Sequence, residues 1–367
     1  MTHSTRPSRI LARSAAVAAI ALALAGCGGS APPEASPPDV SPLVDQAGES
    51  DFLACMVLDA GGFDDKSFNQ SGYEGLVEAQ AKFGIGTKTA ESASDADFAP
   101  NLDMMVSNGC DLTFSIGALL VEATQRAASI HHDAHFAMVD DNSIDAPGVK
   151  PLGFRTSEAS YLAGYAAAAQ TRTGTVATFG GMQIPAVTIF MDGFVQGVAK
   201  YNADKGADVT VLGWNTYSQT GSFCGDFTDT AKGETLTKSL ISQGADIIMP
   251  VAGPVGLGAV AAAKAAGDVA IVWVDADGYE TNPEDSSLFL TSVVKHIGAA
   301  VSSTIAETIE SGFSNEPYLG TLANGGVDIA EFHDFDSQVS DQTKAELLEL
   351  REGIISGEIE ISSPSDP

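Results

Sequence analysis

Short apolar runs rich in β-formers alternate with helical patterns through most of this chain, and this alternation restricts its fold more than any other feature. Runs such as Ile271-Val272-Trp273-Val274 are apolar at every position, as in parallel strands that helices cover on both faces. The sequence therefore predicts an α/β fold of doubly wound parallel sheets flanked by helices. The expected strands are 52–59, 111–116, 135–140, 175–179, 209–214, 246–252, 269–275 and 288–293. The expected helices are 68–83, 98–108, 119–129, 157–171, 185–201, 229–243, 255–266 and 296–311.

The first 26 residues have the three parts of an export signal. Arg6, Arg9 and Arg13 precede an apolar stretch at 15–25, which is too short to span a bilayer, where about 20 residues are needed. The stretch ends in Leu24-Ala25-Gly26-Cys27, which has the form of a lipobox. We expect cleavage before Cys27 and lipid attachment to it, which would hold the mature chain on the extracytoplasmic face of the cell membrane.

The segment 27–50 is rich in Pro, Ser, Ala and Gly without a periodic apolar face, so it is expected to be a flexible tether behind the lipidated cysteine. The remaining body of about 315 residues exceeds one typical domain and suggests two lobes. We expect crossovers near 154, 280 and 315. The expected N-terminal lobe is 51–154 plus 281–314, and the expected C-terminal lobe is 155–280 plus 315–358.

The chain is strongly acidic, with 48 Asp and Glu against 18 Lys and Arg and a net charge of −30. Nucleic acid is an improbable partner for such a chain, because binding phosphates requires a basic surface. Acidity of this degree bears on solubility and not on the choice of fold.

Three cysteines remain after Cys27, and an extracytoplasmic location permits disulfides. Cys55 and Cys110 lie in or beside neighbouring expected strands and are the favoured pair, which leaves Cys224 as a thiol. No spacing typical of zinc sites is present. The nearby His131, His132 and His135 are more simply explained as solvated residues between a helix end and a strand, so no metal or other cofactor is expected.

Polar residues and glycines cluster where the expected strands end, and in doubly wound sheets that edge binds ligands. The densest cluster runs from the first strand into the first helix, where Ser67 and Gln70 have the spacing of a capping box. Its sequence is Asp59-Ala60-Gly61-Gly62-Phe63-Asp64-Asp65-Lys66-Ser67-Phe68-Asn69-Gln70.

This cluster closely resembles the opening motif of the basic membrane protein family, the substrate-binding lipoproteins of ABC transporters that include purine-nucleoside receptors. The resemblance extends over about 52–330 and implies a two-lobed, type I periplasmic-binding-protein fold. Further blocks match in the same order: Tyr161-Leu162-Ala163-Gly164, Gly180-Gly181, Asp192-Gly193-Phe194, Phe227-Thr228-Asp229-Thr230-Ala231-Lys232-Gly233, Gly244-Ala245-Asp246, Val274-Asp275-Ala276-Asp277 and Thr291-Ser292-Val293-Val294-Lys295.

The resemblance implies capture of a purine nucleoside, of the adenosine, guanosine or inosine class, for delivery to the permease of an ABC transporter. The base would stack between two phenylalanines, Phe68 and Phe227. A carboxylate and an amide, Asp59 and Asn69, would meet its polar edges, and Asp140 would face the same cleft. Asp275 with Lys295 would bind the ribose hydroxyls, and Gly253 would offer backbone where no side chain could fit.

Simpler explanations exist for the same residues. Phe68 and Phe227 are also suited to packing, and Asp59 and Asp275 to capping turns at strand ends. Phe223 is an alternative for the second stacking ring. Gly278 follows the Asp275-Ala276-Asp277 block where the family commonly has glutamine, which leaves the identity of the ligand open.

Three other functions remain as alternatives. The same fold also binds riboflavin or other small molecules, or presents its ligand-bound form to a signalling partner. A calcium-dependent nucleoside hydrolase is disfavoured, because Gly61 stands where that family's opening motif has an acid and Asp64 is spaced differently from Asp59. No nucleophile elbow or phosphate-binding loop is present either. We therefore expect a binding protein and not an enzyme.

Overall fold

The computed structural model describes residues 44–46 and 48–367. The signal peptide, Cys27 and most of the expected tether lie outside this range. The described residues belong to one compact unit that contains two large sheets.

The first sheet has seven strands in the order β1-β3-β2-β4-β5-β6-β14. All neighbouring strands run parallel except β1, which pairs antiparallel with β3 at one edge. The strands are β1 (Val44–Gln46), β2 (Leu53–Leu58), β3 (Gly86–Ala90), β4 (Leu112–Ile116), β5 (Phe136–Val139), β6 (Val149–Phe154) and β14 (Tyr318–Gly320).

The second sheet has six strands in the order β15-β13-β12-β11-β7-β8, and only the edge strand β15 is antiparallel to its neighbour. A separate two-stranded hairpin joins β9 (Trp214–Asn215) to β10 (Thr220–Gly221). The strands of the large sheet are β7 (Thr175–Gly180), β8 (Thr210–Leu212), β11 (Ile247–Val251), β12 (Ala270–Asp275), β13 (Phe289–Lys295) and β15 (Val327–Ile329).

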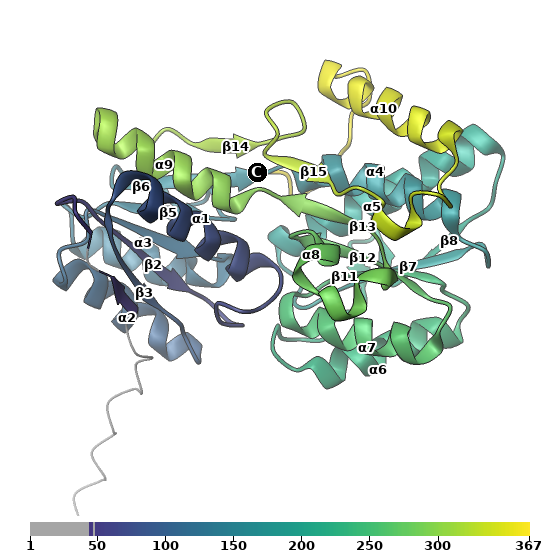
Figure 1. Cartoon of the computed structure of the whole chain (residues 1–367), viewed down its shortest axis with the longest axis horizontal. Coiled ribbons are helices and arrows are strands. Elements are labelled where there is room, and N and C mark those ends of the chain that lie inside the picture. Colours follow the sequence, from purple (N-terminus) through teal and green to yellow (C-terminus); the bar gives the residue numbers. More distant parts are fainter. Residues whose placement is uncertain (1–43, 47) are drawn as a thin grey trace, which may run out of the picture. The chain divides into compact units, whose positions relative to one another are not determined.

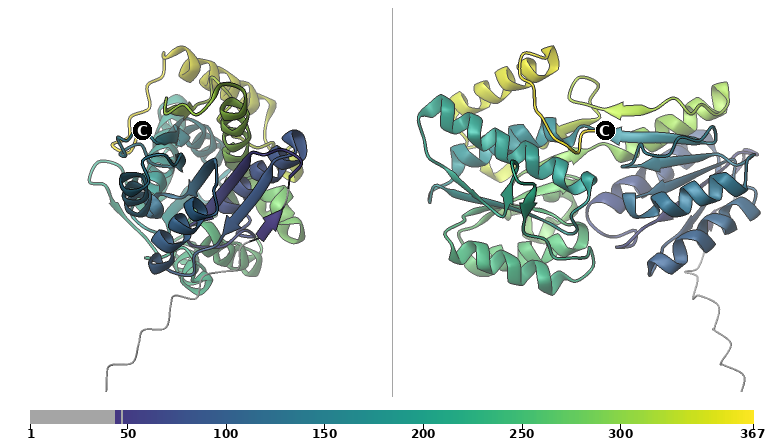
Figure 2. Two further views of the ribbon diagram at one scale, coloured as in Figure 1. Left: turned by 90° about the vertical axis from the view of Figure 1, so that its left-hand side faces the viewer. Right: turned by 180° about the vertical axis from the view of Figure 1, so that it is seen from behind.

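Helices cover both faces of each sheet (Figures 1 and 2). In the first sheet, Ala54 and Met56 of β2 point into the core beneath α1 and α9, and the alternate residues Cys55 and Val57 point into the core beneath α2 and α3. In the second sheet, α4 and α5 cover one face, and α6 and α7 cover the other. The helices are α1 (Phe68–Phe83), α2 (Asp95–Ser107), α3 (Val121–Ile130), α4 (Thr156–Gln170), α5 (Pro185–Lys205), α6 (Thr230–Ser242), α7 (Gly256–Ala266), α8 (Gly278–Thr281), α9 (Ile297–Ser311) and α10 (Asp341–Ser356).

The predicted fold class is confirmed, because each lobe is a parallel-dominated sheet flanked by helices. The chain passes between the sheets after β6, after β13 and after β14. Two of the expected crossovers are therefore misplaced. Strand β13 pairs with β12 in the second sheet, which moves the crossover from 280 to the end of β13, and β14 pairs with β6 in the first sheet, which moves the third crossover beyond 315.

Part of the expected tether also differs from its prediction. Residues Val44–Gln46 form β1 and pair with Thr87–Thr89 of β3, so the segment just before the body extends the first sheet.

The expected pair Cys55 and Cys110 forms a disulfide that joins β2 to the segment before β4, and Cys224 is a free thiol. Among the residues that the structure describes, no helix has the length and apolar character needed to cross a membrane.

Candidate ligand-binding site

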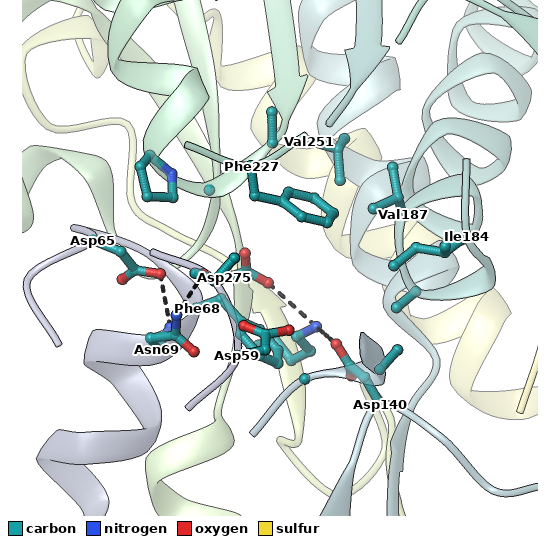
Figure 3. Close-up of a pocket in the computed structure, with 18 of the residues that line it drawn as sticks. Asp59, Asp65, Phe68, Asn69, Asp140, Ile184, Val187, Phe227, Val251 and Asp275 are labelled. Carbon is teal, nitrogen blue, oxygen red and sulfur yellow. Dashed lines mark hydrogen bonds and ion pairs between the residues drawn. The ribbon is translucent and has the colours of Figure 1, made fainter. Parts of the chain in front are cut away.

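A cavity lies between the two lobes, where the carboxyl ends of strands from both sheets come together (Figure 3). The space between protein atoms there amounts to about 520 Å³ when the open solvent at its mouth is included. Its lining comes from the ends of β2, β4 and β5 on one side, and of β11, β12 and β13 with the first turns of α5 on the other.

All eight residues predicted for ligand binding line this one cavity: Asp59, Phe68, Asn69, Asp140, Phe227, Gly253, Asp275 and Lys295. Phe227 enters from the opposite side to Asp59, Phe68 and Asn69 (Figure 3). The alternative ring, Phe223, is not among the lining residues. It packs edge to face on Trp214, with the ring centroids 5.8 Å apart, so the structure favours Phe227 as the aromatic wall.

Asp59 follows directly after β2, and its residue surface is 8% exposed. Burial raises the pKa of this carboxyl well above its usual value, and the neighbouring Asp65 and Asp140 raise it further, against a hydrogen bond from Asn69. Gly117 makes room for the carboxylate: its φ is +112°, and a Cβ there would lie 1.8 Å from Asp59 Oδ2. The end of β4 is therefore shaped around the Asp59 side chain.

Asp65 organises the start of α1, although the sequence assigned that role to Ser67 and Gln70. Its carboxylate accepts hydrogen bonds from the backbone N–H groups of Ser67 (2.9 Å), Asn69 (2.9 Å) and Gln70 (3.0 Å). Burial raises the pKa of Asp65 to about 6 against the effect of these three donors. The predicted capping box is thus wrong, and Asp65 fixes the helix end that carries Phe68 and Asn69 into the cavity.

Lys295 is buried at the end of β13, between carboxylates from both lobes. Its Nζ atom lies 2.6 Å from Asp140 Oδ2 and 3.3 Å from Asp275 Oδ1. The ammonium also lies 4.6 Å from the ring centroid of Phe68 and 5.3 Å from that of Phe190. Burial alone lowers the pKa of Lys295, but the two carboxylates outweigh burial and hold the pKa above its usual value. Burial raises the pKa of Asp140, although Lys295 counteracts this.

The two carboxylates that contact Lys295 have matching backbone conformations. Asp140 follows β5 with φ +69°, and Asp275 ends β12 with φ +68°. Positive φ is uncommon for residues other than glycine and is concentrated at functional sites. The conformation turns both side chains toward the same ammonium, from opposite lobes.

Sequence reasoning missed one wall of the cavity, formed by the first turns of α5. Ile184, Ala186, Val187 and Phe190 supply apolar surface there. The sequence predicts a helix that starts at Pro185. It does not predict which face of that helix meets the other lobe, because this depends on how the lobes are placed. At Gly253, no protein atom lies within 4 Å of the position that a Cβ would occupy. Its φ of +51°, and not crowding, accounts for the glycine.

The loop before α1 also binds the opposite lobe directly. The carbonyl of Lys66 accepts hydrogen bonds from Trp273 Nε1 (2.9 Å) and Thr281 Oγ1 (3.0 Å). The Ser67 hydroxyl lies 3.0 Å from both the carbonyl oxygen of Val274 and a carboxylate oxygen of Asp275. The segment that carries Phe68 is therefore fixed to the second lobe beside the cavity.

The lining chemistry fits binding of a polar, partly flat molecule. It combines aromatic and aliphatic surface with carboxylates, an amide and an ammonium. Within the described part of the chain, no group of three or more His, Cys, Asp or Glu side chains is arranged to hold a metal ion.

A family model described as "ABC transporter substrate-binding protein PnrA-like" matches residues 52–365. This chain belongs to the PnrA-like family. Its family is one of substrate-binding proteins of ABC transporters, which bind small molecules and the transporter's permease, and the predicted family resemblance is confirmed.

Named relatives agree with membership of the PnrA-like family. The chain is 32% identical to the ABC transporter nucleoside-binding protein BmpA of Lactococcus lactis over 86% of this chain and 90% of that protein. It is 28% identical to basic membrane protein A of Borreliella burgdorferi over 84% of this chain and 87% of that protein.

Solved structures of other proteins share the fold. An ABC transporter solute-binding protein from Aeropyrum pernix superposes with a TM-score of 0.77 at 24% identity, covering 86% of this chain and 94% of that one. A transcriptional activator of the comK gene from Bacillus halodurans has a TM-score of 0.67 at 19% identity, covering 84% of this chain and 99% of that one. At these identities the likeness concerns the fold alone.

Proposed function

We propose that this PnrA-like protein captures a purine nucleoside between its lobes and delivers it to the permease of an ABC transporter. The observation that carries the proposal is the pair of phenylalanines, Phe68 from one lobe and Phe227 from the other, in a cavity that also holds acidic and amide side chains. A purine has two flat faces and a rim of donors and acceptors, so it needs this combination. The Lactococcus lactis relative, named as a nucleoside-binding protein, supports the same ligand class.

The charges around the cavity favour a nucleoside over a nucleotide. Asp59, Asp140 and Asp275 line it, and among its described lining residues Lys295 is the only cation. Lys295 already contacts two of these carboxylates, so a phosphate would meet net negative charge at close range. A neutral sugar instead offers hydroxyl donors that carboxylates accept well.

These contacts are strong enough for useful affinity. Stacking contributes roughly 1–3 kcal/mol per base face, and a hydrogen bond to a charged group about 1.5–3 kcal/mol. Two stacked faces and two or three such bonds leave about 8 kcal/mol once the cost of ordering the ligand is subtracted, which corresponds to roughly micromolar dissociation constants. We infer that tight capture requires neither a metal nor a phosphate clamp.

The place of action belongs to the same proposal. The leader sequence and Cys27 support a lipid-anchored protein on the extracytoplasmic face of the cell membrane. Changing Cys27 to Ser is expected to release the protein from membranes without altering its affinity for ligand. Fractionation followed by calorimetry checks this, and a variant that stays in the membrane fraction would contradict the anchor.

The ligand is best identified without assuming its class. Protein purified without dialysis is denatured, and the released small molecules are identified by mass spectrometry. Calorimetric titration with adenosine, guanosine, inosine and riboflavin then ranks the ligands. We expect a purine nucleoside in the released fraction and binding at micromolar concentration or below. Riboflavin alone in both measurements would refute the nucleoside assignment but retain the binding-protein role.

A further inference from the structure

Gly181 lies against the ring of Phe227. It follows the end of β7, and a Cβ at this position would lie 2.4 Å from both Cδ1 and Cε1 of that ring. The next atom, the carbonyl oxygen of Asp226, would be 3.0 Å away, so the ring is the tighter contact. Phe227 lines the ligand cavity, whereas Gly181 is not among the described residues that line it. The ring therefore lies between Gly181 and the cavity.

The backbone of Gly181 is held on both sides by hydrogen bonds. Its N–H donates to the carbonyl of Val251 at the end of β11 (2.9 Å), and its carbonyl accepts from the N–H of Gly225 (2.8 Å). Val251 itself lines the cavity. A shift of this backbone to make room for a side chain would break one of these bonds, so the ring of Phe227 would have to move instead.

The loop that carries Phe227 is also fixed on both sides of the ring. Before it, the N–H of Cys224 donates to the carbonyl of Gly180 (3.0 Å). The neighbouring Asp226 carboxylate accepts from the N–H of Thr228 (2.9 Å). Because the backbone is held at these points, the ring moves away from position 181 mainly by rotation about its own side-chain bonds.

The absence of a side chain at position 181 is explained by this contact and not by backbone strain. The φ of Gly181 lies outside the left-handed region that favours glycine. Relief of a 2.4 Å contact to an ordinary carbon–carbon separation of about 3.5 Å needs a shift of about 1 Å. Since Gly181 is on the side of the ring away from the cavity, that shift would bring the ring into the space opposite Phe68.

We propose that Gly181 is a positioning residue for ligand binding: because it has no side chain, the Phe227 ring lies back from the cavity and leaves the width that a planar base needs opposite Phe68. This inference rests on the proposed function, in which the two rings stack on the base. Stacking depends on the separation and offset of the rings, and close packing tolerates little error in either. Gly181 thus controls ligand affinity without contacting the ligand.

Calorimetry on matched glycine variants tests the role of Gly181. The probe is whichever of adenosine, guanosine and inosine binds the wild type most tightly. Gly181→Ala is expected to weaken its binding about tenfold or more, as for the loss of one stacking face. Gly353→Ala is the control, because its Cβ would also meet a side chain, with Ile359 Cδ1 at 2.8 Å, but on α10, which supplies none of the described lining residues. Equal affinities of the wild type and Gly181→Ala would overturn the proposal.

A second comparison separates positioning of the ring from a general structural effect. In protein that already carries Phe227→Ala, adding Gly181→Ala should change neither the affinity nor the denaturant midpoint, because the methyl group enters space that the ring has left. Loss of affinity by the same factor in both backgrounds would show that Gly181 acts independently of the ring and would overturn the proposal. If Gly181→Ala alone does not fold, a double variant that folds as well as Phe227→Ala supports the proposal, and one that also fails to fold contradicts it.

A crystal structure of Gly181→Ala without ligand tests the inference separately from the function. We expect the ring of Phe227 to be displaced by about 1 Å toward Phe68, the shift that an ordinary carbon–carbon contact requires. A ring in its original position would overturn the positioning role. If none of the three nucleosides binds the wild type, the proposed function fails, whereas this structure still decides whether Gly181 positions the ring.

Discussion

At the scale of single residues, Lys295 is the point where the two lobes and the ligand cavity meet. It lies between Asp140 of the first lobe and Asp275 of the second, and its side chain is only 2% exposed. Removing one partner of such a buried group leaves an uncompensated charge and typically costs 3–5 kcal/mol. We infer that this arrangement holds the carboxylates in place for ligand hydroxyls as well as joining the lobes.

The position of Phe227 in the cavity leads to a prediction about ligand affinity. Changing Phe227 to Ala removes one stacking face, so nucleoside affinity is expected to fall by more than tenfold while the thermal unfolding midpoint changes little, since the ring is only half-buried. Phe223→Ala is the matched control, because Phe223 packs on Trp214 outside the cavity. Calorimetry that shows the larger loss of affinity for Phe223→Ala would reverse the assignment.

The raised pKa of Asp65 leads to a prediction of how the free energy of unfolding depends on pH. Its pKa of about 6 in the folded protein lies above the ordinary value of 3.8, so the folded protein retains a proton that the unfolded chain releases between these values. The contribution of Asp65 to the free energy of unfolding is therefore greatest below pH 3.8 and falls as the pH rises through 6, by up to about 3 kcal/mol.

Asp65→Asn isolates this contribution, because the variant does not titrate at that position. The free energy of unfolding of the wild type, relative to the variant, should increase as the pH is lowered from 7 to 4. Denaturant titrations at several pH values measure the difference, and a difference that is constant across this range would contradict the raised pKa.

At the scale of elements, α1 and α9 approach closely through glycine. A Cβ at Gly75 would lie 2.3 Å from the carbonyl oxygen of Gly298, so the two helix backbones touch there. Helix α1 carries Phe68 into the cavity, and α9 begins two residues after Lys295. Their contact fixes two parts of the site relative to each other.

Changing Gly75 to Val should force these helices apart. Overpacking of this kind costs typically 1–3 kcal/mol, and a larger cost is expected here because the crowding atoms belong to backbone. Denaturant unfolding measures it. Val77→Ala is the control on the same helix, because Val77 is 43% exposed, and an equally large loss in that variant would argue against the close contact as the cause.

The elements that sequence reasoning found are those with apolar runs or clear helical faces. Helix α1 has the predicted bounds, but β3 and β6 were missed. Strand β3 alternates threonine with other residues instead of forming an apolar run, and β6 contains Lys150 and Pro151. Helix α10 was missed as well, although its buried residues Leu347, Leu350 and Ile354 recur at helical spacing.

The residues that line the cavity were predicted more accurately than the lobe boundaries. The family resemblance implied eight residues, and all eight line one cavity. The predicted lobe boundary at 280 was wrong, because the sequence of an apolar strand such as β13 is compatible with either sheet. Only its pairing with β12 decides its lobe.

At the scale of the whole molecule, the contacts between lobes suggest how ligand capture is coupled to closure. The Ser67 hydroxyl and the Lys66 carbonyl bond to the second lobe beside the cavity. Such bonds contribute only when the lobes are together, so they favour a closed arrangement around the ligand.

Ser67→Ala is therefore expected to weaken ligand binding by about three- to tenfold, the effect of one hydrogen bond of 0.5–1.5 kcal/mol. Calorimetry measures the affinity, and small-angle scattering with ligand measures the size of the particle. Ser71→Ala, one turn further along α1, should change neither. Unchanged affinity in Ser67→Ala would exclude this contact from closure.

The most direct test of the account is a crystal structure of the protein with the purine nucleoside that binds tightest in the titrations. We predict density for the base between the rings of Phe68 and Phe227, with the ribose hydroxyls against Asp275 and Lys295. A nucleoside bound elsewhere on the molecule, with these two rings in contact with protein alone, would contradict the account.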